Sequence, residues 1–139
     1  MQTTKHGNIS IREPSQELDH HAHAVIGAAI EVHRLLGPGL FEAFYERALC
    51  IELGLRAISF TTQAVVSLDY KGHAIGETRL DLRVGQGLVV ELKAVESLTA
   101  VHFAQVLCYL RAAACPLGLL INFNVPVLRQ SVRRIVNSL

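Results

Sequence analysis

Apolar side chains first recur every three or four positions, as expected for helices with one buried face. A helix is predicted from about Gln16 to Leu36, and Gly37-Pro38-Gly39 predicts its end because proline cannot continue the hydrogen-bond ladder. A second helix is predicted from about Leu40 to Leu53. The first stripe consists of Leu18, Ala22, Val25, Ala29, His33 and Leu36, and the second of Phe41, Phe44, Ala48, Ile51 and Leu55.

Beyond residue 60 the hydrophobic period changes to two, which is typical of strands. Phe60 to Tyr70 and Ala74 to Val84 are predicted strands, joined by a tight turn at Lys71-Gly72. The register of this hairpin stays open, because a bulge near Gly76 would re-aim one strand. A third strand is predicted for Leu88 to Ala94.

The last third of the chain predicts a helix, a buried strand and one ambiguous segment. Leu98 to Ala114 has a helical stripe, and Leu117 to Phe123 is a continuous apolar run, typical of a strand buried on both faces. Val132 to Val136 fits either an edge strand or a short helix. We therefore expect a flexible N-terminal arm over residues 1–15 and a single α/β domain over residues 16–139. Its predicted order is α-α-β-β-β-α-β, with a mixed central sheet flanked by helices.

Composition narrows the classes of function. The 139 residues suit one domain, and the net charge of +1 excludes a protein that grips nucleic acid by bulk charge alone. The absence of Trp and the aromatic content of 6% leave little for a base-stacking platform. Cys50, Cys108 and Cys115 show no C-x-x-C spacing, and we expect buried thiols in a reducing cytoplasm. No apolar run approaches the roughly 20 residues of a membrane span, so no membrane contact is expected.

The candidate chemistry lies on the second and third predicted strands, which a three-residue glycine-containing loop connects. If Val84 pairs with Leu88, Asp81 lies directly opposite Glu91. Side chains alternate along a strand, so Lys93 shares the face of Glu91. Two carboxylates and an amine then converge on one side of the sheet. Six apolar residues are expected on the other side: Leu80, Leu82, Val84, Leu88, Val90 and Leu92.

These groups match the needs of a divalent cation and a phosphate. Magnesium prefers oxygen ligands and keeps several waters, so the carboxylates of Asp81 and Glu91 plus a substrate phosphate suffice. The carbonyl of Leu92 is a further candidate ligand. Lys93 would orient the attacking water or stabilise the phosphorane charge. The alternative is an amphipathic hairpin with a solvated charged face.

Two helical features could complete such a site. Glu42 stands at the start of the second helix, three residues before Tyr45, where a carboxylate also simply favours the helix dipole. On the third helix, His102, Gln105 and Tyr109 are spaced three and four apart and share one polar flank. That flank faces either the carboxylates or solvent.

Taken together, these segments resemble a known family. Gly39-x-x-Glu42-x-x-Tyr45 is the motif after which the GxxExxY proteins are named. Further segments resemble the sequences of that family: Ile26–His33, Leu36–Leu40, Val90–Val95, Gln105 with Tyr109, and Gly118–Phe123. The resemblance covers about residues 16–137, and this family looks like a compact branch of the PD-(D/E)XK nuclease superfamily.

The resemblance implies a restriction-endonuclease-like core and a metal-dependent phosphodiesterase that hydrolyses DNA rather than RNA by metal-activated water attack, with magnesium or manganese. It implies that the catalytic residues are Asp81, Glu91, Lys93, Glu42 and Gln105. It implies metal ligation by Asp81, Glu91, Leu92 and Glu42, with Glu42 holding a metal-bound water or a second metal. Tyr45, Tyr109 and His102 are expected to support the catalytic residues from the surrounding shell.

Two other functions remain open on the same fold. Superfamily members include inactive and binding-only relatives, so the chain could be a non-catalytic nucleic-acid-binding or regulatory module. It could also be a subunit of a larger nucleic-acid-processing assembly. The small size and apolar chain are compatible with a homodimer.

Overall fold

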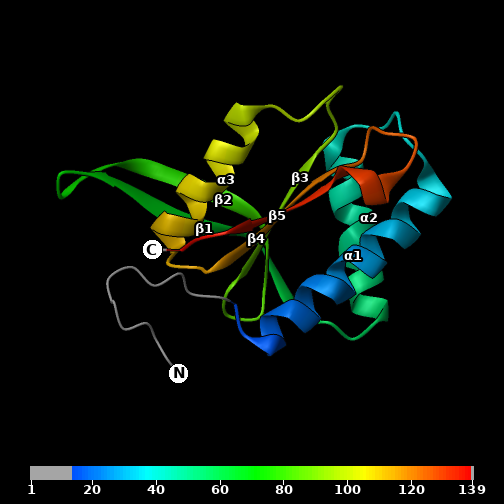
Figure 1. Cartoon of the computed structure of the whole chain (residues 1–139), viewed down its shortest axis with the longest axis horizontal. Coiled ribbons are helices and arrows are strands. Elements are labelled where there is room, and N and C mark those ends of the chain that lie inside the picture. Colours follow the sequence, from blue (N-terminus) through cyan, green and yellow to red (C-terminus); the bar gives the residue numbers. More distant parts are fainter. Residues whose placement is uncertain (1–13, 139) are drawn as a thin grey trace.

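A five-stranded mixed sheet forms the centre of the computed structural model, which describes residues 14–138. Its strand order is β1-β2-β3-β4-β5, with α1 and α2 covering one face and α3 the other (Figure 1). The elements are α1 (Gln16–Leu36), α2 (Glu42–Leu55), β1 (Phe60–Tyr70), β2 (His73–Val84), β3 (Leu88–Lys93), α3 (Ala100–Ala113), β4 (Leu117–Asn122), a 3-10 turn η1 (Leu128–Ser131) and β5 (Val132–Val136). The predicted order is confirmed, while the arm expected over residues 1–15 lies outside the described residues except for its last two positions.

Helix α1 begins and ends where the sequence predicts. The Ser15 side chain accepts a hydrogen bond from the Leu18 amide at 3.2 Å, which caps the first turn. Gly37 has a φ of 70° and donates its amide to the His33 carbonyl at 2.8 Å, which ends the helix. His33 itself is buried, and its Nε2 lies 2.7 Å from the Val125 carbonyl oxygen, so it is a satisfied core histidine.

Helix α2 presents the opposite face from the one predicted. The apolar stripe that includes Phe41, Phe44 and Ile51 is exposed to solvent. The buried face instead consists of Tyr45, Leu49 and Leu53, spaced four apart. The helix carries two apolar stripes, and the longer one points away from the sheet. Its first residue is Glu42, with Phe41 as the capping residue.

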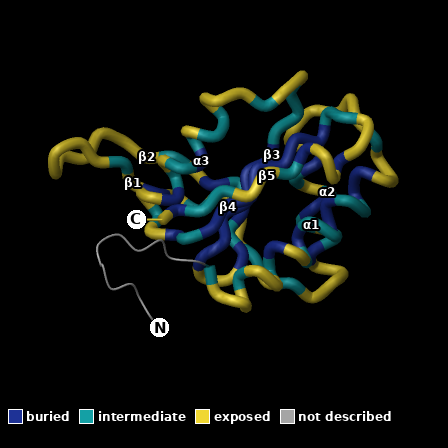
Figure 2. Tube along the Cα trace, in the orientation of Figure 1, coloured by how far each residue is buried: buried dark blue, intermediate teal, exposed yellow. Residues whose placement is uncertain are grey.

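The β1–β2 hairpin projects beyond the body of the domain, and its tip is exposed (Figures 1 and 2). Lys71 and Gly72 have φ values of 50° and 81°, as the type I′ turn of a two-residue hairpin requires. The register then shifts, because Leu68 lies opposite Gly76 and Asp69 lies opposite Ala74. This is the bulge anticipated near Gly76.

Strand alternation breaks in the middle of the hairpin, so the prediction for Leu80 is wrong. Leu80 packs beneath α3 with Val66, whereas Leu82 packs beneath α1 and α2. Gln63, which would pair with Asp81, has a φ of 54° and drops out of the ladder. This left-handed residue re-aims β1 at the level of Asp81.

The middle of the sheet is its most buried part. Strands β3 and β4 pair in parallel, and every residue of β4 is buried (Figure 2). The ambiguous segment Val132–Val136 is an edge strand, antiparallel to β4. Contrary to expectation, Cys108 is exposed, on the outer face of α3. Within residues 14–138 no helix is long and apolar enough to cross a membrane.

Candidate active site

Two carboxylates occupy the point where β2 and β3 separate. Regular pairing of these strands runs from Val84–Leu88 to Leu82–Val90 and stops there. At the next position the side chains replace the ladder: the Asp81 amide donates to Glu91 Oε2 at 2.9 Å. In return the Leu92 amide donates to Asp81 Oδ2 at 2.9 Å. The structure therefore brings Asp81 and Glu91 together by a pair of crossed hydrogen bonds, which we call the carboxylate clamp.

Lys93 and Gln105 extend the site toward α3. Lys93 lies two residues beyond Glu91 on the same face of β3, and its Nζ donates to Gln105 Oε1 at 3.2 Å. The polar flank of α3 is thus divided. Gln105 faces the site, while the His102 ring accepts the Thr99 amide at 3.0 Å in the capping box of α3. Tyr109 is half-buried against the apolar cluster beneath α3.

Burial and mutual repulsion raise the pKa values of the carboxylates. The pKa of Glu91 is raised to about 8, first by burial and then by the charge of Asp81. Burial also raises the pKa of Asp81, against the lowering effects of the Leu92 amide and of Lys93. The pKa of Glu42 is raised by burial and by Asp81, so Glu42 lies within the electrostatic reach of the clamp. A cation would relieve this concentration of negative charge.

Glu46 and Gln63 belong to the same surroundings, and the sequence analysis missed both. The Gln63 side chain donates to Glu46 Oε2 at 2.9 Å, and burial together with the charge of Asp81 raises the pKa of Glu46. Glu46 follows Glu42 by four residues on α2, so helical spacing was a usable signal. For Gln63 the sequence carries no such signal.

The donor set suits a hard divalent cation. Each bond of the clamp uses one oxygen of a carboxylate, which leaves Glu91 Oε1 to act as a ligand. The amide and carbonyl of one strand residue point to the same edge, so the Leu92 carbonyl also faces the gap beside Asp81. Among residues 14–138 no group of three or more His, Cys, Asp and Glu side chains stands close enough to hold a metal ion. A cation here must complete its shell with the carbonyl, waters and substrate oxygens, as magnesium does.

Tyr45 fixes the loop that leads into Glu42. Its hydroxyl donates to the Gly37 carbonyl at 2.7 Å and accepts from the Leu40 amide at 3.1 Å. Its ring stacks on Phe123 with centroids 4.6 Å apart. Gly39 has a φ of 106°, a conformation that side chains disfavour. The spacing of these three residues therefore has a structural reason. Gly39 permits the turn, Glu42 follows the turn as the first residue of α2, and the Tyr45 hydroxyl bonds the backbone of the turn.

We expect Tyr45→Phe to lower the free energy of unfolding by about 1–2 kcal/mol, because the Gly37 carbonyl and the Leu40 amide lose a buried partner. Urea denaturation would measure the loss. Tyr70→Phe is the matched control, because Tyr70 is exposed at the hairpin tip and its loss of a hydroxyl should cost less than about 0.5 kcal/mol. Equal stability of the Tyr45 variant and the wild type would contradict this role.

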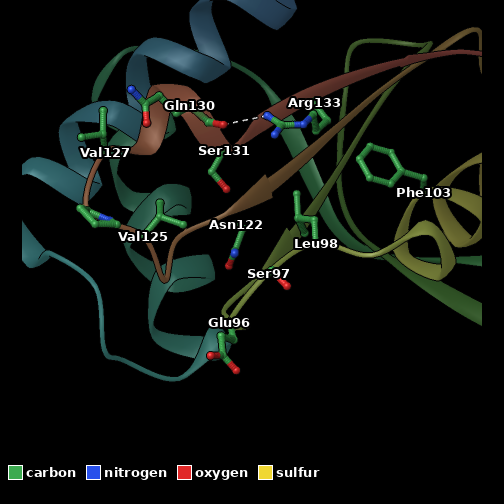
Figure 3. Close-up of a pocket in the computed structure, with 11 residues that line it drawn as sticks. Glu96, Ser97, Leu98, Phe103, Asn122, Val125, Val127, Gln130, Ser131 and Arg133 are labelled. Atoms are coloured by element: carbon green, nitrogen blue, oxygen red, sulfur yellow. Dashed lines mark hydrogen bonds between the residues drawn. The ribbon is translucent and has the colours of Figure 1, made fainter.

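A separate cavity of about 480 Å³ lies beside the end of β3 (Figure 3). Its lining includes Phe103, Asn122 and Arg133, but none of Asp81, Glu91 and Lys93. The Asn122 side chain bonds both backbone groups of Val95, at 3.0 and 2.9 Å, and so fixes the chain just after Lys93. The Arg133 guanidinium donates to the Gln130 carbonyl at 2.8 Å at its rim. The cavity is therefore distinct from the carboxylate clamp.

Comparison with known proteins gives one finding. A family model described as the PD-(D/E)XK nuclease superfamily matches residues 19–135. The matched segment contains the carboxylate clamp, Lys93, Gln105 and Glu42. No curated protein and no solved structure matches the chain.

Proposed function

Because the chain belongs to the PD-(D/E)XK nuclease superfamily, we propose that it hydrolyses phosphodiester bonds in DNA with magnesium or manganese. Within that superfamily we assign it to the GxxExxY branch, on the motif that ends at Tyr45. The observation that carries the proposal is the carboxylate clamp. It sets Asp81 and Glu91 into one gap, with the amine of Lys93 on the adjoining position of the same face.

Each residue has a definable task in this reaction. Asp81, Glu91 and the Leu92 carbonyl would hold a divalent cation, which when bound would supply Lewis-acid polarisation of the phosphate and a lowered pKa of water. Lys93 stabilises the negative charge that grows on the phosphorus oxygens. Gln105 orients the Lys93 amine through the bond at 3.2 Å and can donate its amide to the backbone phosphate. Glu42, whose pKa is raised by burial and by the charge of Asp81, would accept a hydrogen bond from a water at the site.

The proposal is tested by a cleavage panel on duplex, single-stranded and branched DNA and on RNA. Magnesium, manganese and a chelator are compared, and Asp81→Ala is assayed beside the wild type. We expect metal-dependent cleavage of at least one DNA substrate and its loss in the variant, which lacks a cation ligand. Two results would contradict the proposal: no cleavage under any condition, or equal cleavage by both proteins.

The net charge of +1 favours an alternative in which the chain does not cleave DNA by itself, either as a non-catalytic nucleic-acid-binding module or as a subunit of a larger assembly. Such a protein has little charge with which to hold DNA by itself. Salt-dependent binding of DNA without turnover, or turnover only with a second protein present, would support this alternative over an independent nuclease.

A further inference from the structure

The outward face of α2 carries an apolar stripe that nothing within residues 14–138 covers. Phe41, Phe44, Ile51 and Leu55 are 79%, 53%, 63% and 76% exposed. Ala48 lies between them, half-buried and partly packed against the core beneath α1 and α2, and with it the spacings are three, four, three and four, which is the a/d pattern of a two-helix seam. The rings of Phe41 and Phe44 stack on each other with centroids 6.3 Å apart.

The order of side-chain sizes in this stripe is the same in both directions: two large residues, a small one, and two large residues. Ala48 lies at the midpoint, seven residues from Phe41 and seven from Leu55, with Phe44 and Ile51 on either side. A small residue at the centre lets two helices approach closely, and large residues toward both ends can then interdigitate. The stripe is therefore complementary to a reversed copy of itself, as a two-fold symmetric interface requires.

We propose that two copies of the chain associate through this stripe, with their α2 helices antiparallel about a two-fold axis at Ala48. In this arrangement Phe41 packs near Leu55 of the second copy, and Phe44 packs near Ile51 of the second copy. The stripe residues are apolar and flanked by the exposed Arg47 and by the Arg56–Glu52 ion pair at 2.7 Å, which gives the seam a polar rim.

The area of the stripe is adequate for such a pair. An aromatic side chain can bury about 150–250 Å² and a large aliphatic one somewhat less, so these four partly exposed residues offer on the order of 400–500 Å² per copy. Together the two copies approach the roughly 1,200 Å² at which specific interfaces begin.

Sedimentation equilibrium of the full chain tests the proposal. We expect a mass of twice 15.2 kDa for the wild type, and half that mass for Phe44→Glu and for Ile51→Lys, because each places a charge in the seam. Circular dichroism and thermal melting check that both variants stay folded. Val101→Lys is the matched control, since Val101 is 74% exposed on α3 across the sheet, and it should remain dimeric.

The double variant Phe44→Glu, Ile51→Lys tests the register. Across an antiparallel seam the Glu at position 44 of each copy lies near the Lys at position 51 of the other, which gives two opposite-charge pairs. We therefore expect the mass to return to that of a dimer. A monomeric wild type, dimeric single variants, or a double variant that stays monomeric would each overturn the proposal. The measured mass does not depend on cleavage, so this test and the test of nuclease activity can fail separately.

Discussion

Lys93→Met is expected to lower the cleavage rate about 10²–10³-fold, because the transition state loses its positively charged partner. The substitution keeps the length of the side chain and removes the charge. Lys93 is half-buried and bonds only Gln105 among the described side chains, so the fold should tolerate the change. Single-turnover kinetics with saturating enzyme would measure the rate of the chemical step, and cation-induced stabilisation would show that metal binding is retained.

Lys71→Met serves as the matched control for this experiment. Lys71 is exposed at the tip of the β1–β2 hairpin, so the same chemical change there should leave the single-turnover rate within about twofold of the wild type. If Lys93→Met cleaves as fast as the control, Lys93 does not take part in the chemical step.

The stability of the metal-free protein is expected to fall as the pH rises from about 5 to about 8. The pKa of Glu91 is raised from its usual value of 4.5 to about 8 in the folded state, chiefly by burial. Between these values the folded protein holds a proton that the unfolded chain has released, so rising pH favours unfolding. The raised pKa of Asp81 acts in the same direction. Urea denaturation in the presence of a chelator, repeated across this pH range, would measure the slope.

Glu91→Gln should remove most of this pH dependence. The neutral amide has no charge to desolvate, so at about pH 8 we expect the variant to be more stable than the wild type by on the order of 4 kcal/mol. At about pH 5 the two proteins should be similar, because Glu91 is then protonated in the fold. Magnesium should stabilise the wild type at the higher pH and leave the variant unchanged.

Glu77→Gln provides the comparison, because Glu77 is exposed on β2 and carries the same chemical change. Its stability profile should follow that of the wild type. A wild-type profile that rises with pH would show that the clamp holds both carboxylates ionised without a cation. A Glu91→Gln profile parallel to that of the wild type would show that Glu91 does not cause the pH dependence.

The proximity of Asp81 and Glu91 was predictable because three local rules agree, although the crossed bonds that replace the ladder there were not predicted. A short glycine-containing loop fixes the pairing of Val84 with Leu88, strict alternation fixes the faces, and the equal distance from the loop places Asp81 opposite Glu91. The sequence also predicts the bounds of α1, because one unambiguous stripe ends at Gly37-Pro38-Gly39. Where an element has only one apolar face, its local sequence is sufficient to predict which face is buried.

The error on α2 has a different origin. The helix carries two apolar stripes, and hydrophobic periodicity does not state which one meets the sheet. The buried choice is decided by tertiary contacts: Tyr45 must stack on Phe123 and hold the loop at Gly37. That partner lies almost eighty residues away in the chain, beyond the reach of any local window. The other stripe is the one we assign to a second copy.

The error on Leu80 is also non-local. Alternation along β2 fails because Gln63 of the neighbouring strand adopts a left-handed conformation that glutamine does not favour. The Gln63 side chain also donates to Glu46 on α2. This bond fixes the position of β1 relative to α2 at the point where β1 lies opposite Asp81. No pattern within β2 alone contains this information.

The crossed bonds at Asp81 and Leu92 also mean that the pairing of β2 with β3 ends in two carboxylate side chains instead of backbone groups. An ion that binds the remaining oxygens of the two acids withdraws charge from the same carboxylates that the Asp81 and Leu92 amides bond, and so weakens those two bonds. Occupancy of the centre and fraying of the strand ends are thereby coupled. The rates at which the Asp81 and Leu92 amides exchange with deuterated solvent would therefore report whether a cation occupies the site.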